Sequence, residues 1–200
     1  MEKTTHSRSD QKSVWNVPNS LTLARFILSV VTFGLVAGER YLGALVCFLI
    51  AASTDWIDGY WARKYGQVTK VGRIFDPFVD KIIICGAFIA LVEVKDAGIE
   101  PWMAIVVVAR ELLVTSLRGL IEGGGGDFSA KQLGKWKMVL QCVAVVVVLL
   151  SLMQPPWGAW LVILRTWVVW GAIALTVYSG FEYVRIAAKQ MQQPLAKEGS

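Results

Sequence analysis

Long apolar stretches, separated by shorter polar ones, follow one another along the chain. A helix needs about 20 apolar residues to cross the hydrocarbon core of a bilayer. Six stretches approach or exceed this length, and they predict helical spans at 21–37, 41–65, 75–94, 101–121, 133–153 and within 157–187. Pro18, Asn19 and Ser20 mark the start of the first helix. Arg165 indicates that the membrane part of the last span begins near Thr166.

The composition favours the same class of protein. Hydrophobic residues make up 55% of the chain and charged residues 18%, whereas soluble domains carry about 25% charged residues. The nine tryptophans and five tyrosines fit aromatic belts at the two membrane surfaces. We therefore expect an all-α integral membrane protein, a bundle of six transmembrane helices in one domain.

Basic residues gather on one side of this predicted topology. With six spans, the N-terminal tail, the linker after the second span, the linker after the fourth span and the C-terminal tail share a side. These segments and their borders carry Lys3, Arg8, Lys12, Arg63, Lys64, Lys70, Arg73, Lys81, Arg118, Lys131, Lys135, Lys137, Arg185, Lys189 and Lys197. The opposite side offers Arg40, Lys95 and Arg165. The positive-inside rule then places both termini in the cytoplasm. We expect an N-terminal cytoplasmic interfacial tail at 1–16, a membrane domain at 17–187 and a C-terminal tail at 188–200.

Other potential sites are weaker. Cys47, Cys85 and Cys142 are isolated in apolar runs and predict neither a disulfide framework nor a metal site. The run of glycines at 123–126 lacks the Gly-Lys-Ser/Thr continuation of a phosphate-binding loop, so we interpret it as a flexible connection.

Four aspartates lie in and beside the second and third spans, in the segment DWIDGYWARKYGQVTKVGRIFDPFVD. Asp55 and Asp58 are three residues apart, and Asp76 and Asp80 are four apart, so each pair shares one face of a helix. If the two helices run antiparallel, with the turn at 65–73, the four carboxylates meet at the cytoplasmic end of the bundle. Gly59 and Ala62 leave room there for a ligand or a second helix.

Converging carboxylates need compensation, because they repel one another and lose hydration in a low-dielectric site. Hard divalent cations such as Mg²⁺ or Mn²⁺ favour all-oxygen ligands. Four aspartates suffice for two ions, the arrangement that clamps a transferring phosphoryl group. The alternative is ion pairing with the neighbouring Arg and Lys side chains.

The spacing Asp55-x2-Asp58-Gly59-x2-Ala62-Arg63-x8-Gly72-x3-Asp76-x3-Asp80 resembles the signature of the CDP-alcohol phosphotransferases at all eight fixed positions. The resemblance implies an integral membrane enzyme with six transmembrane helices, a homodimer and a two-metal site at the cytoplasmic side. It implies metal ligation by Asp55, Asp58, Asp76 and Asp80, with Asp80 also serving as the general base. It further implies that Gly59, Arg63, Asn19 and Thr69 contact the CDP group.

Polar residues of the fourth and fifth spans suggest the acceptor. Arg110 and Glu111 lie well inside the fourth span, and Glu111 and Arg118 are nearly aligned on one face. Lys135, Lys137 and Gln141 open the fifth span. Several cations near the cytoplasmic side suit an acceptor that carries phosphate. For Arg118 and the two lysines the alternative is an ordinary boundary residue that snorkels to the interface.

The stretches VPNSLTLAR, ARELLVTSLRGL and GKWKMVLQ look like the corresponding regions of bacterial phosphatidylglycerophosphate synthases. That resemblance implies transfer of a phosphatidyl group from CDP-diacylglycerol to sn-glycerol 3-phosphate in the inner membrane of a bacterium. The alternatives are another acceptor (serine or inositol phosphate), a divalent-cation transporter and a catalytically silent assembly protein. The acidic residues gather at one end of the spans without a polar ladder across the bilayer, which argues against a transporter.

Overall fold

The computed structural model describes residues 17–65, 70–123, 132–153 and 158–192. Within these ranges the side chains of 17–18, 55–65, 70–74, 76, 122–123, 132–135 and 191–192 lie outside the description.

The described residues form six helices and no strand, which confirms the all-α prediction. The helices are α1 (Val17–Ala37), α2 (Tyr41–Tyr65), α3 (Lys70–Val92), α4 (Pro101–Gly123), α5 (Gln132–Leu152) and α6 (Gly158–Gln192). Two of them, α1 over Asn19–Ala37 and α6 over Gly158–Gln190, are long and apolar enough to cross a membrane by length and composition.

Each predicted span overlaps one of these helices, and the bounds differ by a few residues. Helix α1 begins at Val17, so Pro18 lies in its first turn, where a missing N–H costs nothing. Helix α3 begins at Lys70 and continues through Pro77, so the residues at 70–73 are helical and do not belong to the expected turn. Helix α6 begins at Gly158 and includes Arg165.

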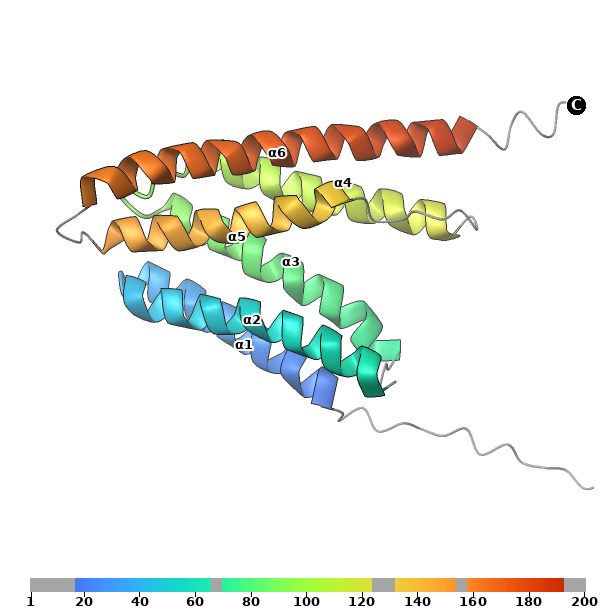
Figure 1. Cartoon of the computed structure of the whole chain (residues 1–200), viewed down its shortest axis with the longest axis horizontal. Helices are drawn as coiled ribbons and strands as arrows, with labels where there is room; N and C mark the ends of the chain where they lie inside the picture. Colours follow the sequence, from blue (N-terminus) through green and yellow to red (C-terminus); the bar gives the residue numbers. More distant parts are fainter. Residues whose placement is uncertain (1–16, 66–69, 124–131, 154–157, 193–200) are drawn as a thin grey trace, which may run out of the picture.

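The six helices pack as two groups of three (Figure 1). Helix α1 contacts both α2 and α3, and α6 contacts both α4 and α5. Contacts of α3 with α4 and of α2 with α5 join the groups. One apolar core runs through both groups and includes Phe48, Phe88, Leu91, Met103 and Leu149. Figure 1 shows α1, α3 and α5 starting, and α2, α4 and α6 ending, at the same end of the molecule, which we call the motif end.

Helix α1 distributes its polar and apolar side chains in the opposite way to a surface helix of a water-soluble protein. Its buried face carries Thr22, Arg25, Ser29 and Thr32. Its exposed face carries Leu23, Phe26, Ile27, Val30 and Val31. Buried hydroxyls are satisfied within the helix, since Ser29 Oγ donates to the Arg25 carbonyl at 2.8 Å and Thr32 Oγ1 to the Leu28 carbonyl at 2.8 Å. The polar side of this helix therefore faces other helices and its apolar side faces outward.

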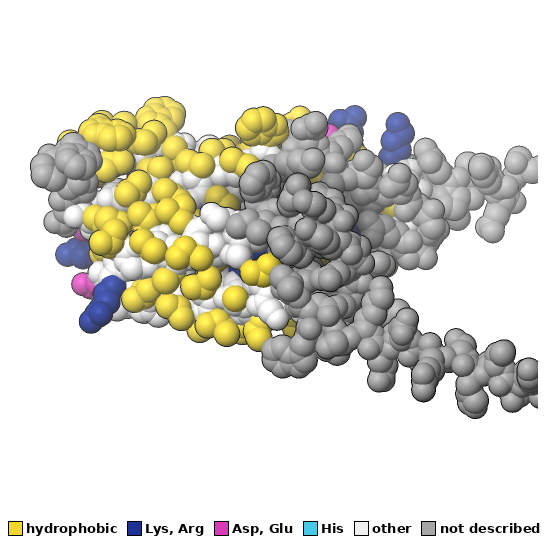
Figure 2. Space-filling view, turned by 60° about the horizontal axis from the view of Figure 1, so that its bottom comes forward, with side chains coloured by type: hydrophobic (Ala, Val, Ile, Leu, Met, Phe, Trp, Pro, Cys, Tyr) yellow, Lys and Arg dark blue, Asp and Glu magenta, His cyan; other side chains and the backbone are white. Residues whose placement is uncertain are grey.

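The same reversal recurs elsewhere in the bundle. Buried polar side chains on α5 and α6 include Lys137, Gln141, Ser151, Thr176 and Ser179, whereas exposed apolar ones include Trp136, Val139, Trp167 and Phe181. Figure 2 shows hydrophobic side chains over much of the part of one face that is not grey, with a few charged side chains at its left edge and upper right. A contiguous apolar surface of this kind marks a surface that is covered by protein or lipid.

Arg165 ties α6 to the loop between α3 and α4, at the end opposite the motif end. Its Nη1 donates to the carbonyl of Asp96 and lies 3.4 Å from Ser151 Oγ. Asp96 and Gly98 both adopt positive φ, 64° and 70°, in this loop. A Cβ on Gly98 would lie 3.0 Å from Arg165 Nε, so the loop closes tightly around the guanidinium.

Candidate active site at the motif end

The four aspartates lie on two helices that meet at the motif end. Asp55 and Asp58 are in the second half of α2, and Asp76 and Asp80 are in the first half of α3. Helices α2 and α3 contact each other, and both pack against α1. The backbone thus brings both halves of the motif to the same end of the bundle (Figure 1).

The side chains of Asp55, Asp58, Arg63 and Asp76 lie outside the described residues, as does Thr69. Gly59 lies in the same part of α2. Among the side chains that the structure does describe, no group of three potential metal ligands comes together. The meeting of the four carboxylates therefore stays a prediction, whereas the position of Asp80 is an observation.

Asp80 pairs with a buried arginine of α1. Arg25 Nη1 lies 2.6 Å from Asp80 Oδ1, and Arg25 is only 1% exposed. The Asp80 side chain is 26% exposed, so the carboxylate is accessible while it is held. A charge-assisted contact of this length is among the stronger hydrogen bonds that a protein makes.

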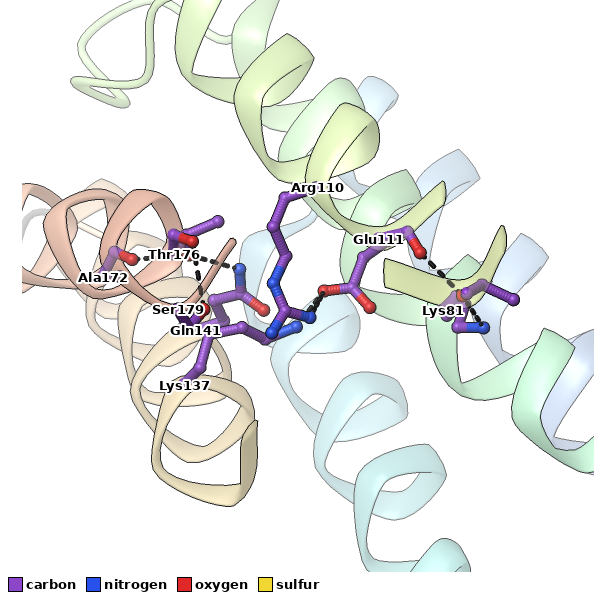
Figure 3. Close-up of polar contacts among 9 residues, drawn as sticks. Lys81, Arg110, Glu111, Lys137, Gln141, Ala172, Thr176 and Ser179 are labelled. Carbon is purple, nitrogen blue, oxygen red and sulfur yellow. Dashed lines mark hydrogen bonds and ion pairs between the residues drawn. The ribbon is translucent and has the colours of Figure 1, made fainter. Parts of the chain in front are cut away.

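A second polar group lies where α4, α5 and α6 meet (Figure 3). Glu111 Oε1 of α4 accepts from Lys137 Nζ of α5 and lies 3.1 Å from Arg110 Nη1. Arg110 also stacks on α6, with its guanidinium carbon 5.4 Å from the centre of the Tyr183 ring. All three charged residues are buried, so two cations share one carboxylate in the interior of the bundle.

Arg110 packs against Gly180, and two of its own N–H groups have no partner among the described residues. A Cβ on Gly180 would lie 3.2 Å from Arg110 Cγ, so this glycine leaves room for the arginine stem. Arg110 Nε and Nη2 are buried and make no hydrogen bond to the described residues. Buried donors without a partner are uncommon, and they favour the presence of a further ligand.

Gln141 lies one turn after Lys137 on α5 but bonds toward α6 instead. Its Nε2 donates to Thr176 Oγ1 at 2.9 Å, and Thr176 Oγ1 in turn donates to the Ala172 carbonyl at 2.6 Å. Gln141 is 1% exposed, so the bond ties α5 to α6 inside the bundle. Lys81, the residue after Asp80, reaches the other side of α4, where its Nζ donates to Thr115 Oγ1 at 2.5 Å.

The structure thus brings together only part of the predicted acceptor pocket. Arg110, Glu111 and Lys137 are in direct contact. Arg118 lies two turns along α4 from Glu111, and Lys135 has its side chain outside the described residues. Asn19 lies in the first turns of α1, the helix that also carries Arg25.

The contributors that were not assigned from the sequence include Arg25, Lys81 and Tyr183, together with Thr115, Thr176 and Gly180. For Arg25 a signal exists, because an arginine inside an apolar helix requires a partner. For Lys81 and Tyr183 no local pattern distinguishes a partner across the bundle from a boundary residue.

Comparisons with known proteins place this arrangement in a family. A family model described as CDP-alcohol phosphatidyltransferase matches residues 15–178, which include all four aspartates and also Arg110, Glu111 and Lys137. The chain belongs to the CDP-alcohol phosphatidyltransferase family. Its relatives include proteins named CDP-diacylglycerol–glycerol-3-phosphate 3-phosphatidyltransferase from Bacillus subtilis and Rickettsia felis. The first is 36% identical over 85% of this chain and 94% of the relative, and the second 34% identical over 87% and 96%.

A protein of the same name from Haemophilus influenzae is 30% identical over 86% of this chain and 94% of the relative. The match therefore spans almost the whole of each relative. In this CDP-alcohol phosphatidyltransferase, Asp80 is the motif aspartate whose side chain the structure describes, and this side chain pairs with Arg25.

Proposed function

We propose that this chain transfers the phosphatidyl group of CDP-diacylglycerol to sn-glycerol 3-phosphate, giving phosphatidylglycerol phosphate and CMP. The observation that carries the proposal is the complete eight-position aspartate motif in a chain that aligns, over 85% and 87% of its length, with two relatives named for this reaction. The enzyme class follows from the family, and the acceptor follows from the names of the relatives.

The reaction is a direct displacement at phosphorus. A hydroxyl of glycerol 3-phosphate attacks the phosphorus that carries diacylglycerol, and the bond from that phosphorus to the oxygen bridging to CMP breaks. Asp80 accepts the hydroxyl proton. The pairing with Arg25 supports this role, because it holds the carboxylate in place while leaving it accessible.

The donor set fits hard divalent cations, because aspartate carboxylates supply only oxygen ligands. Asp55, Asp58, Asp76 and Asp80 would hold two ions, Mg²⁺ or Mn²⁺. Cations held there would supply charge neutralisation for the pyrophosphate and the leaving CMP. Arg63, Gly59, Asn19 and Thr69 would contact the CDP group.

The acceptor phosphate would bind near Lys137 and Arg110, with Arg118, Lys135 and Gln141 around it. Two observations support this site. The buried cations Arg110 and Lys137 exceed the single carboxylate of Glu111, which leaves net positive charge. In addition, Arg110 has two buried N–H groups without a partner among the described residues.

The distribution of side chains on the helices supports a position within the membrane. Each of the six helices exposes large apolar side chains, while arginine, glutamine, serine and threonine are buried. This distribution is costly in water and suits hydrocarbon, where polar groups must find partners inside the protein. We propose six membrane spans in a domain at 17–187, with both tails and the motif end in the cytoplasm of a bacterial cell, at its inner membrane, and a homodimeric assembly.

The test is an acceptor panel. The detergent-purified protein is given CDP-diacylglycerol with Mg²⁺ or Mn²⁺ and one of glycerol 3-phosphate, serine or inositol phosphate, and CMP release is measured. We expect glycerol 3-phosphate to be the preferred acceptor, with no release when the acceptor is omitted. Faster release with serine or inositol phosphate would refute the acceptor and leave the donor chemistry standing.

Two variants separate the donor site from the acceptor site. Asp76→Asn is expected to abolish release with every acceptor. Arg118→Ala is expected to raise KM for glycerol 3-phosphate more than it lowers kcat. Mild, equal effects of both substitutions would contradict both assignments.

A further inference from the structure

Helix α1 presents its charged residue to the motif and not to the surface. Arg25 is 1% exposed, and its helix neighbours Leu23 and Phe26 are exposed and apolar. Burying a guanidinium costs several kcal/mol unless it is paired and hydrogen-bonded. The partner that the structure provides is Asp80 of α3, at 2.6 Å.

The contact joins a carboxylate of the motif to a helix that carries none of the motif's eight positions. Arg25 holds the Oδ1 side of Asp80, while the carboxylate keeps a quarter of its surface exposed. A carboxylate that a buried guanidinium anchors, and that stays partly exposed, is oriented before any substrate arrives. Preorganisation of this kind fixes which oxygen faces the reacting groups.

A second close contact joins the same two helices. Further along them, Gly86 of α3 faces Phe33 of α1, and a Cβ at Gly86 would lie 2.2 Å from Phe33 Cζ. The absent side chain lets α1 and α3 approach closely. Both helices run in the same direction (Figure 1), so this contact and the Arg25–Asp80 contact follow one another along a single interface.

We infer that Arg25 is a positioning residue for Asp80, which it holds in the orientation needed for cation binding and proton transfer. The inference rests on the proposed function, and it adds a residue outside the aspartate motif to the machinery. Hydrogen-bond partners of ligating carboxylates orient the ligand, and their loss costs about 10–100-fold in metal affinity or activity.

The experiment measures Mn²⁺ binding directly, by the electron paramagnetic resonance signal of free Mn²⁺, on detergent-purified full-length protein without substrates. The kcat and KM of CMP release are measured in parallel. Arg25→Met removes the charge and keeps the length of the side chain. We expect its dissociation constant for Mn²⁺ to rise about 10–100-fold and kcat to fall, with KM for glycerol 3-phosphate nearly unchanged. Arg25→Lys should give an intermediate affinity, because an ammonium pairs with the carboxylate but lacks the planar fork.

Arg165→Met is the matched control. It removes another guanidinium that ties helices together, at the opposite end of the bundle, and its Mn²⁺ affinity should equal that of the wild type. A double variant tests whether Arg25 acts on Mn²⁺ affinity through Asp80. In an Asp80→Asn background, adding Arg25→Met should change Mn²⁺ affinity no further.

Two results would overturn the inference: wild-type Mn²⁺ affinity in folded Arg25→Met, or an undiminished effect of Arg25→Met in the Asp80→Asn background. Should Arg25→Met not fold, Arg25→Lys decides, and an affinity equal to wild type refutes the role. A wild-type protein that binds Mn²⁺ but transfers nothing to glycerol 3-phosphate would refute the proposed function instead.

Discussion

Glu111 should be one of the most sensitive positions for stability in the bundle. Its carboxylate is the shared partner of Arg110 and Lys137, and all three residues are buried. The substitution Glu111→Gln keeps the size of the side chain and removes the charge. Two buried cations then face each other without an anion between them.

The magnitude follows from the geometry. At 3.1 Å between Arg110 Nη1 and Glu111 Oε1, the Coulomb attraction is about 5 kcal/mol at an effective dielectric constant of about 20. Desolvation offsets most of this gain in the intact pair, so the pair itself contributes little net stability. Removing one partner leaves the desolvation uncompensated, and we expect the free energy of unfolding to fall by about 3–5 kcal/mol. This is a factor of roughly 10²–10⁴ in the folding equilibrium.

The assay is unfolding by SDS in mixed detergent micelles, followed by circular dichroism. Glu100→Gln is the matched control, because Glu100 is exposed and accepts one hydrogen bond from Trp102 Nε1 at 2.6 Å. The control should lose no more than about 0.5 kcal/mol, as is usual at the surface. A second variant, Glu111→Gln with Lys137→Met, removes one of the unpaired cations and should recover part of the loss. If Glu111→Gln and Glu100→Gln have the same free energy of unfolding in SDS, the reasoning from buried charge is wrong.

The remaining predictions concern glycines and the metal. Gly86→Ala should lower the free energy of unfolding by about 1–3 kcal/mol, because its Cβ would overlap the Phe33 ring. Gly119→Ala, where nothing lies within 4 Å, should raise the same quantity by about 0.5–1 kcal/mol in the SDS assay, and a loss there would contradict the packing argument. Gly98→Ala should destabilise, because φ is 70° and Arg165 crowds the added Cβ; an unchanged unfolding curve would count against this strain. Removing divalent cations with EDTA should abolish CMP release, and Mg²⁺ or Mn²⁺ should restore it; activity that survives chelation contradicts a metal-dependent reaction.

Much of the fold follows from the hydrophobic pattern. The prediction of a helix at 41–65 matches α2 at both ends, because the apolar run is bounded by a charged turn at Arg40 and by the polar linker after Tyr65. The start of α3 was predicted too late, since Lys70 and Arg73 read as turn residues by their polarity. Tertiary context overrides such local preferences at helix ends.

The polar sites were only partly predictable, for a different reason. Spacing along a helix places Asp76 and Asp80 on one face, but it does not say which helix that face meets. The sequence identified Arg110, Glu111 and Lys137 as members of one region, and the structure adds that Glu111 binds both cations. Arg25 had no assigned role, because its partner lies far away along the chain and only packing brings α1 beside α3.

Because α1 touches both α2 and α3, the amino-terminal half of the chain contains all the helices on which the aspartates depend. The ribosome completes this half before α4 emerges. The Arg25–Asp80 pair can therefore form during synthesis, before the later helices are complete. A truncated chain ending after Val92 contains α1, α2 and α3 in full, including both members of this pair, and it is a suitable starting point for studying how the bundle assembles.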